Sequence, residues 1–231
     1  MRTGIAAVTG VTLLAALAGV SSTAAAPASA HPFRPFNEDG GNWSGYVASG
    51  SGFSSVTATW TEPDVSCTSN SDLYAPWVGI DGSGSRSVEQ TGVQTDCSSG
   101  SPVNSPWYEM YPQNPVYWSD TVRAGDTITA GVSRSGTSYT LTLSDKTRGW
   151  TEHTTQSYNG KNVSAEVILE SPSSSYPNFG TIGFSGATID GSALSAAHPS
   201  ALDANSSAGT EDHTSAIGSG GESFSVNYLQ E

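Results

Sequence analysis

Basic residues are scarce in this chain of 231 residues. It has 8 Lys plus Arg against 21 Asp plus Glu, and only 13% of its residues are charged. A protein with a net charge of -13 repels phosphate, so neither nucleic acid nor an anionic membrane is an expected partner. Few bases also mean few salt-bridged carboxylates to lose and little cationic repulsion in acid, which are the two main causes of acid unfolding. Many secreted proteins that do not function in acid have the same charge balance.

Cysteine is almost absent as well. Cys67 and Cys97 are the two cysteines of the chain, and no His-x-x-x-His or Cys-x-x-Cys spacing accompanies them. A lone pair in a secreted chain predicts a disulfide rather than a metal site, and no metal or cofactor is expected. Closure of the intervening loop would stabilise the fold by roughly 3–4 kcal/mol.

The N-terminus predicts a cleaved secretory signal over residues 1–30. Arg2 precedes an apolar run from Ile5 to Val20, and Ala28-Ser29-Ala30 offers small residues to a signal peptidase. The run falls short of the roughly 20 apolar residues that a membrane span needs. We therefore expect a secreted protein with a short N-terminal segment or prosegment at 31–41, followed by a single domain at 42–231.

Long helical patterns are missing from the rest of the chain, which predicts an all-β sandwich. Short runs rich in Val, Ile, Thr, Trp and Tyr alternate with clusters of Gly, Ser, Asn and Pro. A long surface loop is expected at 190–222. The expected strands are 56–60, a meander of 127–133, 139–144 and 149–155, and then 179–184, 186–189 and 223–229.

Four further segments carry polar side chains where a plain strand would alternate apolar and polar residues. Alternate residues of a strand share a face. If the segments are neighbours, one sheet has a hydrophobic core on one side and a ligand groove on the other. The alternative is that Glu166 and Glu170 simply point to solvent. The segments are 77–81, 88–93, 105–111 and 165–170, and their polar or aromatic face holds Trp77, Asp81, Gln90, Trp107, Glu109, Tyr111, Glu166 and Glu170.

The common hydrolase motifs are also absent. There is no Gly-x-Ser-x-Gly, no His-Glu-x-x-His, and no Asp-Thr-Gly or Asp-Ser-Gly. The four histidines, His31, His153, His198 and His213, lie outside the polar segments and are predicted to be surface residues. Acid–base chemistry is therefore left to carboxylates and amides.

Five stretches resemble the glutamic peptidases, or eqolisins, which are acid proteases insensitive to pepstatin. They are Asn42-Trp43-Ser44-Gly45, residues 77–82, Gln90-Thr91-Gly92-Val93, residues 107–112 and residues 165–170. The resemblance implies a concanavalin A-like sandwich of two large antiparallel sheets, a polypeptide substrate and no cofactor. We expect a monomer.

The same resemblance implies site residues. It matches the catalytic pair to Gln90 and Glu170, with Glu170 activating a water and Gln90 stabilising the oxyanion. Three positions depart from the family pattern and bear on pH optimum and substrate preference: Gln94 and Ser105 replace aspartates, and Val167 replaces a tryptophan. The substrate-binding residues are expected to be Trp77, Asp81, Trp107, Glu109, Tyr111 and, from its shared face, Glu166.

Two other interpretations use the same residues. A glycoside hydrolase on the same architecture would use Glu109 and Glu170 as its carboxylate pair, with the aromatic residues binding sugar rings. A non-catalytic carbohydrate- or peptide-binding module would use the same face without chemistry. Gln90 separates them, because a glycosidase needs no amide at that position.

Overall fold

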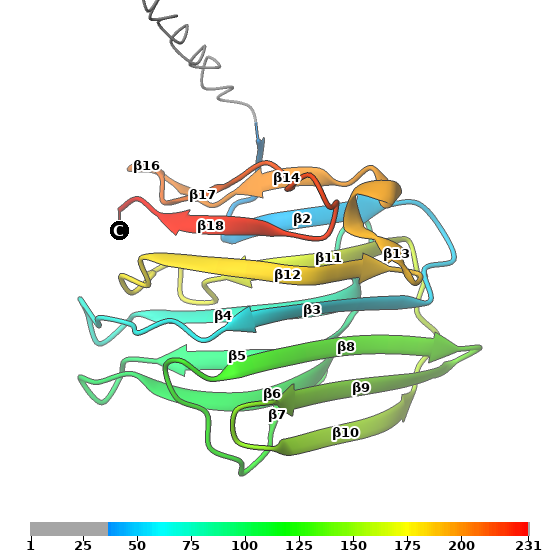
Figure 1. Cartoon of the computed structure of the whole chain (residues 1–231), viewed down its shortest axis with the longest axis horizontal. Helices are drawn as coiled ribbons and strands as arrows, with labels where there is room; N and C mark the ends of the chain where they lie inside the picture. Colours follow the sequence, from blue (N-terminus) through cyan, green and yellow to red (C-terminus); the bar gives the residue numbers. More distant parts are fainter. Residues whose placement is uncertain (1–36, 231) are drawn as a thin grey trace, which may run out of the picture. The chain divides into compact units, whose positions relative to one another are not determined.

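The computed structural model describes residues 37–230. The predicted signal at 1–30 and most of the segment at 31–41 lie outside the described residues. Within 37–230, no helix has the length and apolar character needed to cross a bilayer. The described chain forms two large sheets of eight strands each, and these face each other, with β12, β3 and β8 of one sheet in front of β11, β4 and β5 of the other in Figure 1. The expected all-β sandwich is confirmed.

The first sheet brings the polar segments together. Its central strands β11, β4, β5 and β6 are hydrogen-bonded neighbours, all antiparallel. In order across the sheet, the strands are β1 (Glu38–Asp39), β14 (Ser200–Asp203), β2 (Trp43–Ser49), β11 (Ser164–Glu170), β4 (Leu73–Asp81), β5 (Val88–Asp96), β6 (Val103–Tyr111) and β7 (Val116–Tyr117).

The second sheet contains the predicted meander. Strands β8, β9 and β10 pair in sequence order, as the runs at 127–133, 139–144 and 149–155 indicated. The two runs at 179–184 and 186–189 form one strand, β12, with a bulge at Ser185–Thr188. In order, the strands are β10 (Trp150–Ser157), β9 (Ser138–Asp145), β8 (Thr127–Ser135), β3 (Ser55–Thr61), β12 (Thr181–Ile189), β18 (Phe224–Tyr228) and β17 (Asp212–Thr214).

The expected surface loop at 190–222 is wrong. This stretch contains β14, which completes the first sheet beside β2, and β17, which pairs with β18 in the second. Its Leu194, Leu202 and Ala204 are buried. The strands are short and rich in Ser, Ala and Asp, so their apolar periodicity is too weak to be detected in sequence. The smaller elements here are β13 (Ser192–Ala193), the 3-10 helix η1 (Leu194–Ala197), β15 (Asn205–Ser206) and β16 (Gly209–Thr210).

The hydrophobic core lies between the two sheets. Alternating residues of β8 and β9, such as Ile128 and Leu141, are fully buried against Val78 and Val167 of the first sheet. A second, smaller cluster around Trp77, Trp107 and Ile168 covers the outer face of the first sheet. That sheet is therefore apolar on both sides, which is what forms a floor for a site on its outer face.

The predicted disulfide is present. Cys67 and Cys97 are bonded, with their Cα atoms 5.7 Å apart. The bond ties the connection between β3 and β4 to the end of β5. It thereby fixes one end of the strand that carries Gln90.

Candidate active site

A cavity of about 520 Å³ opens on the outer face of the first sheet. This volume lies within the range of ligand-binding clefts. Its apolar lining includes Trp43, Val88 and Trp107. The polar groups that line it are Ser85, Arg86, Ser87, Gln90, Gln94, Glu109, Tyr111 and Glu170.

Strand register sets the spacing of these side chains. Gln90 lies opposite Glu109, and Val88 lies opposite Tyr111, so both pairs project from the same face. Gly92 lies between Trp77 and Trp107 in the next row. A Cβ at Gly92 would come within 2.2 Å of the Pro76 carbonyl oxygen and 2.7 Å of the Trp77 Cβ. Only glycine at this position therefore leaves room for Trp77 in the neighbouring strand.

Glu170, the last residue of β11, is held by two donors, one from β4 and one from the turn before β2. Trp77 Nε1 donates to Oε2 over 3.1 Å, and Asn42 Nδ2 donates to Oε1 over 3.0 Å. Trp43 packs edge-on against Trp77, with ring centroids 5.1 Å apart. Burial raises the pKa of Glu170, while hydrogen bonds from Trp43, Trp77 and Asn42 act in the opposite direction.

Gln90 is oriented by Glu109. Its Nε2 donates to Glu109 Oε2 over 2.6 Å, and its Oε1 is buried with no protein partner among the described residues. Burial raises the pKa of Glu109; the Gln90 hydrogen bond lowers it and the charge of Glu170 raises it. The amide therefore has one N–H engaged, while its carbonyl oxygen keeps an unused acceptor.

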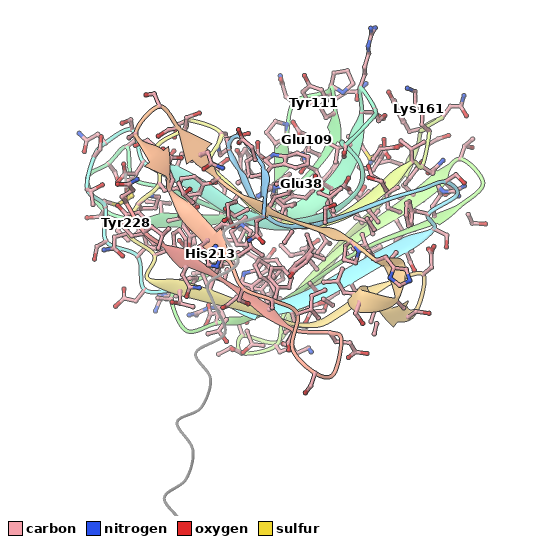
Figure 2. All side chains as sticks on the ribbon, turned by 90° about the horizontal axis from the view of Figure 1, so that it is seen from above. Glu38, Glu109, Tyr111, Lys161, His213 and Tyr228 are labelled. Atoms are coloured by element: carbon pink, nitrogen blue, oxygen red, sulfur yellow. A yellow bond between two sulfur atoms is a disulfide. The ribbon has the colours of Figure 1, made fainter. Side chains whose placement is uncertain are left out.

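The aromatic residues that the sequence indicated occupy different depths. Trp77, which the sequence placed among the binding residues, has no exposed surface and does not line the cavity, whereas Trp107 does. Tyr111 is 50% exposed at the rim. Figure 2 shows Glu109 and Tyr111 close together at the upper edge of the molecule in that view.

Asp81 does not line the cavity. It is fully buried, and its carboxylate accepts hydrogen bonds from the backbone N–H groups of Asn162 and Val163 at 2.8 and 3.0 Å. Its φ of 68° breaks the alternation that would have placed it with Trp77. A Cβ on Gly160 would lie 2.7 Å from Asp81 Oδ2 and 3.1 Å from Glu89 Oε2. Asp81 thus helps to fix the loop before β11 and has no surface with which to touch substrate.

Glu166 is also withdrawn from the cavity. It has no exposed surface, and Oε1 accepts a 3.4 Å hydrogen bond from the backbone N–H of Ser83. Burial raises its pKa well above the usual range. The two glutamates of β11 therefore differ in their surroundings, since Glu170 lines the cavity and Glu166 supports the loop beside it.

Three residues of the cavity region were not predicted as site residues. Asn42 and Trp43 belong to a stretch already noted, but their chain position gave no indication that they contact Glu170. The Asn42 amide also donates to the Ser171 carbonyl at 3.0 Å, so the side chain of this Asn-x-Ser asparagine is used in hydrogen bonds at the site. Arg86 lies in a Gly- and Ser-rich turn, where sequence gives no periodicity to follow.

Metal-binding geometry is not found in the described part of the chain. No group of three or more His, Cys, Asp or Glu side chains there could hold an ion. His213 pairs with Asp203 over 2.9 Å and, like His153 and His198, does not line the cavity.

Comparison with known proteins gives a consistent result. The model of the peptidase A4 family matches residues 41–228. Aspergillopepsin-2 from Aspergillus niger is 29% identical over 223 residues, covering 81% of this chain and 77% of that protein. Scytalidopepsin B from Scytalidium lignicola is 33% identical over 159 residues, covering 63% of this chain and 59% of that protein. The crystal structure of scytalido-glutamic peptidase with a transition state analog inhibitor superposes with a TM-score of 0.72 at 25% identity, covering 83% of this chain and all of that one.

Proposed function

Since this chain belongs to the peptidase A4 family of glutamic endopeptidases, we propose that it cleaves peptide bonds with a dyad of Gln90 and Glu170. The observation that carries the proposal is that both side chains line one cavity, in which the carbonyl oxygen of Gln90 has no protein partner among the described residues. Family membership also favours peptide hydrolysis over the glycoside hydrolase and binding-module alternatives.

Glu170 acts as the general base. As a carboxylate it removes a proton from a water molecule, which attacks the scissile carbonyl carbon. Protonated Glu170 then returns the proton to the leaving nitrogen as the C–N bond breaks. Trp77 and Asn42 donate to its two oxygens, and these hydrogen bonds favour the ionised form that the first step requires.

Gln90 positions the water and stabilises the oxyanion. Its Oε1 accepts from the attacking water, and its free N–H donates to the oxygen that becomes negative. A neutral amide keeps its donors at every pH, so it suits a reaction in acid. Because Nε2 is already bonded to Glu109, the amide is oriented before substrate binds.

The remaining cavity residues bind the substrate chain. We assign Trp107, Glu109 and Tyr111 to direct contact, because they line the cavity. Trp77 is buried beside the cavity and holds Glu170 through its indole N–H. Asp81 and Glu166, which the sequence placed among the binding residues, act from beneath by supporting the flanking loops.

We extend the proposal to where and how the enzyme works. Residues 1–30 direct secretion, the mature enzyme is a monomer, and it is active in acid. The two carboxyl groups that line the cavity, Glu109 and Glu170, and the small number of bases in the chain support activity in acid.

The test compares Glu170→Gln with Glu166→Gln on the same strand, and adds Gln90→Ala on β5. Glu170→Gln should lower kcat/KM on denatured globin by about 10²–10⁴-fold, and Gln90→Ala by about 10²–10³-fold. Glu166→Gln, the same chemical change four positions earlier, should remain active below about pH 5, because a buried carboxyl with a raised pKa is already neutral there. Cleavage should resist pepstatin. Full activity of Glu170→Gln would contradict the dyad.

A further inference from the structure

The turn between β4 and β5 places a cation at the cavity. Residues 82–87 connect Asp81 to Val88, which pair across the two strands. Within this turn Arg86 is exposed and lines the cavity, and it is the one Lys or Arg among the cavity-lining residues. The described chain 37–230 has six Lys and Arg in all, in a protein with 21 acids. A basic residue at this cavity is therefore unusual for a chain of this composition.

The turn is fastened to the structure beneath it. Ser164 Oγ donates to the Ser83 carbonyl over 2.9 Å, and Ser83 N–H reaches Glu166. Ser85 Oγ accepts from Ser87 N–H over 3.3 Å. These contacts anchor the backbone around Arg86. Arg86 therefore lies in a turn whose backbone is fixed by hydrogen bonds.

A second base lies at the same turn. Lys161 Nζ donates to the Gly84 carbonyl over 3.5 Å, and Figure 2 shows Lys161 at the same upper edge of the view as Glu109 and Tyr111. Lys161 does not line the cavity. It nevertheless adds positive charge to the turn that carries Arg86.

The two carboxylates that line the cavity accept hydrogen bonds from residues other than Arg86. Glu109 accepts from Gln90, and Glu170 accepts from Trp77 and Asn42. Within the described residues, Arg86 has no ion pair and no hydrogen bond from its side chain. Its five donors are therefore available to a ligand without breaking an internal pair.

We propose that Arg86 is a specificity-determining residue that pairs with a carboxylate of the substrate peptide. The proposal rests on the peptidase function above and adds a substrate preference to it. Strand register places the turn at one end of the site. The Val88–Tyr111 row comes first after the turn, and the Gln90–Glu109 row follows it. Glu170 pairs with Ala75 and lies two rows beyond the Gln90–Glu109 row. The favoured acidic residue therefore lies to one side of the scissile bond and away from Glu170.

The preference should depend on pH through the substrate. Side-chain carboxyls of Asp and Glu in a flexible peptide ionise near pH 4, whereas an arginine stays charged throughout the acid range. The titratable groups that face Arg86 across the cavity are Glu109, Glu170 and Tyr111. These groups are the same in the wild-type enzyme and in the Arg86 variants, so the change in the Glu-to-Gln ratio between enzymes isolates the pairing.

The experiment uses pairs of fluorogenic peptides with both ends blocked, carrying Glu or Gln at each position on either side of the cut. At pH 5 the wild-type enzyme should prefer Glu at one position by about fivefold in kcat/KM, the size of a favourable exposed ion pair. The preference should disappear at pH 3. Arg86→Gln should abolish it and Arg86→Glu should reverse it. The ratio is read within each variant, so an overall loss of activity does not affect the result.

Arg123→Gln is the matched control, because it removes the same charge from a residue that does not line this cavity. It should keep the wild-type ratio. A preference that survives in Arg86→Gln, or that Arg123→Gln also removes, would overturn the proposal. Peptides with a free C-terminal carboxylate distinguish a terminal from a side-chain carboxylate. An error in the proposed catalytic dyad would be seen in a different result, namely cleavage of peptides by the Glu170→Gln variant.

Discussion

Gln90 Nε2 lies 2.6 Å from Glu109 Oε2, directly across the pairing of β5 and β6. This hydrogen bond decides that the nitrogen end of the amide, rather than its oxygen end, points to Glu109. A free amide side chain could turn over and exchange its donor and acceptor ends. The Glu109 carboxylate prevents that exchange by accepting from the nitrogen only.

Loss of the Glu109 acceptor should therefore reduce catalysis. We expect Glu109→Leu to lower kcat by about tenfold or more, because misplacing a positioned group has effects of that size. Glu109→Gln should recover much of the loss, since its carbonyl oxygen can accept from Gln90. The measurement is steady-state kinetics of both variants on one peptide. Equal losses in the two variants would show that the charge of Glu109, rather than its acceptor, matters.

Removal of the Trp77 donor should shift the acidic limb of the pH–rate profile. Trp77 Nε1 stabilises the Glu170 carboxylate, so Trp77→Phe should raise the pKa of Glu170. The acidic limb of kcat/KM should move to higher pH by about one unit. Trp150→Phe is the control, because Trp150 belongs to the other sheet and loses an indole hydrogen bond to the Thr121 carbonyl. A limb that stays in place in Trp77→Phe would contradict the assigned base.

Buried acids should make the protein more stable in acid than at neutral pH. Burial, followed by neighbouring charge, raises the pKa of Glu89 and of Asp212 to about 8. An unfolded chain ionises these groups near pH 4, so the native state holds protons that the unfolded state has lost. The stability they contribute is complete below about pH 4 and is lost as the pH rises towards 8.

Asp212→Asn tests the direction of this dependence of stability on pH. Both carboxyl oxygens of Asp212 are buried without a hydrogen-bond partner among the described residues. At pH 7 the neutral amide should raise the free energy of unfolding by on the order of 2–4 kcal/mol, with little change at pH 4. Urea denaturation at the two pH values measures the difference. Asp64→Asn, at an exposed position, should change neither value. Equal effects of Asp212→Asn at both pH values would contradict the linkage.

The disulfide should contribute to stability through the unfolded state. Replacing Cys67 and Cys97 together with Ala should lower the free energy of unfolding by roughly 3–4 kcal/mol, because the unfolded chain regains the freedom of the closed loop. Denaturation of the variant and of wild-type protein treated with reductant should agree. A loss below about 1 kcal/mol would show that the unfolded chain remains compact around this loop.

Much of the sheet that carries the site could be predicted from strand alternation. Val78, Ile80 and Val167 belong to the core between the sheets, while Trp77, Gln90 and Glu170 belong to the opposite face. The prediction failed where the backbone left regular strand geometry. Asp81 has a positive φ, which turned its carboxylate away from the face that alternation assigned to it.

The sequence could not distinguish Glu166 from Glu170, because both lie on the same face of one strand. Their surroundings depend on the turn at 82–87 and on the chain before β2, which are far away in sequence. The turn covers Glu166 through Ser83, while Asn42 reaches Glu170 beside the cavity. For the same reason the β14–β17 region was missed, because its short polar strands are stable only against β2 and β18.

The sequence by itself determined the sandwich, the disulfide and the two strands that carry Gln90 and Glu170, because local alternation and two lone cysteines encode them. Only the tertiary structure decided what each of these residues contacts. It paired Gln90 with Glu109, surrounded Glu170 with indole and amide donors, buried Asp81 and Glu166, and placed Arg86 at the cavity. These outcomes depend on register and on distant segments meeting, and long-range packing rather than local propensity fixes both.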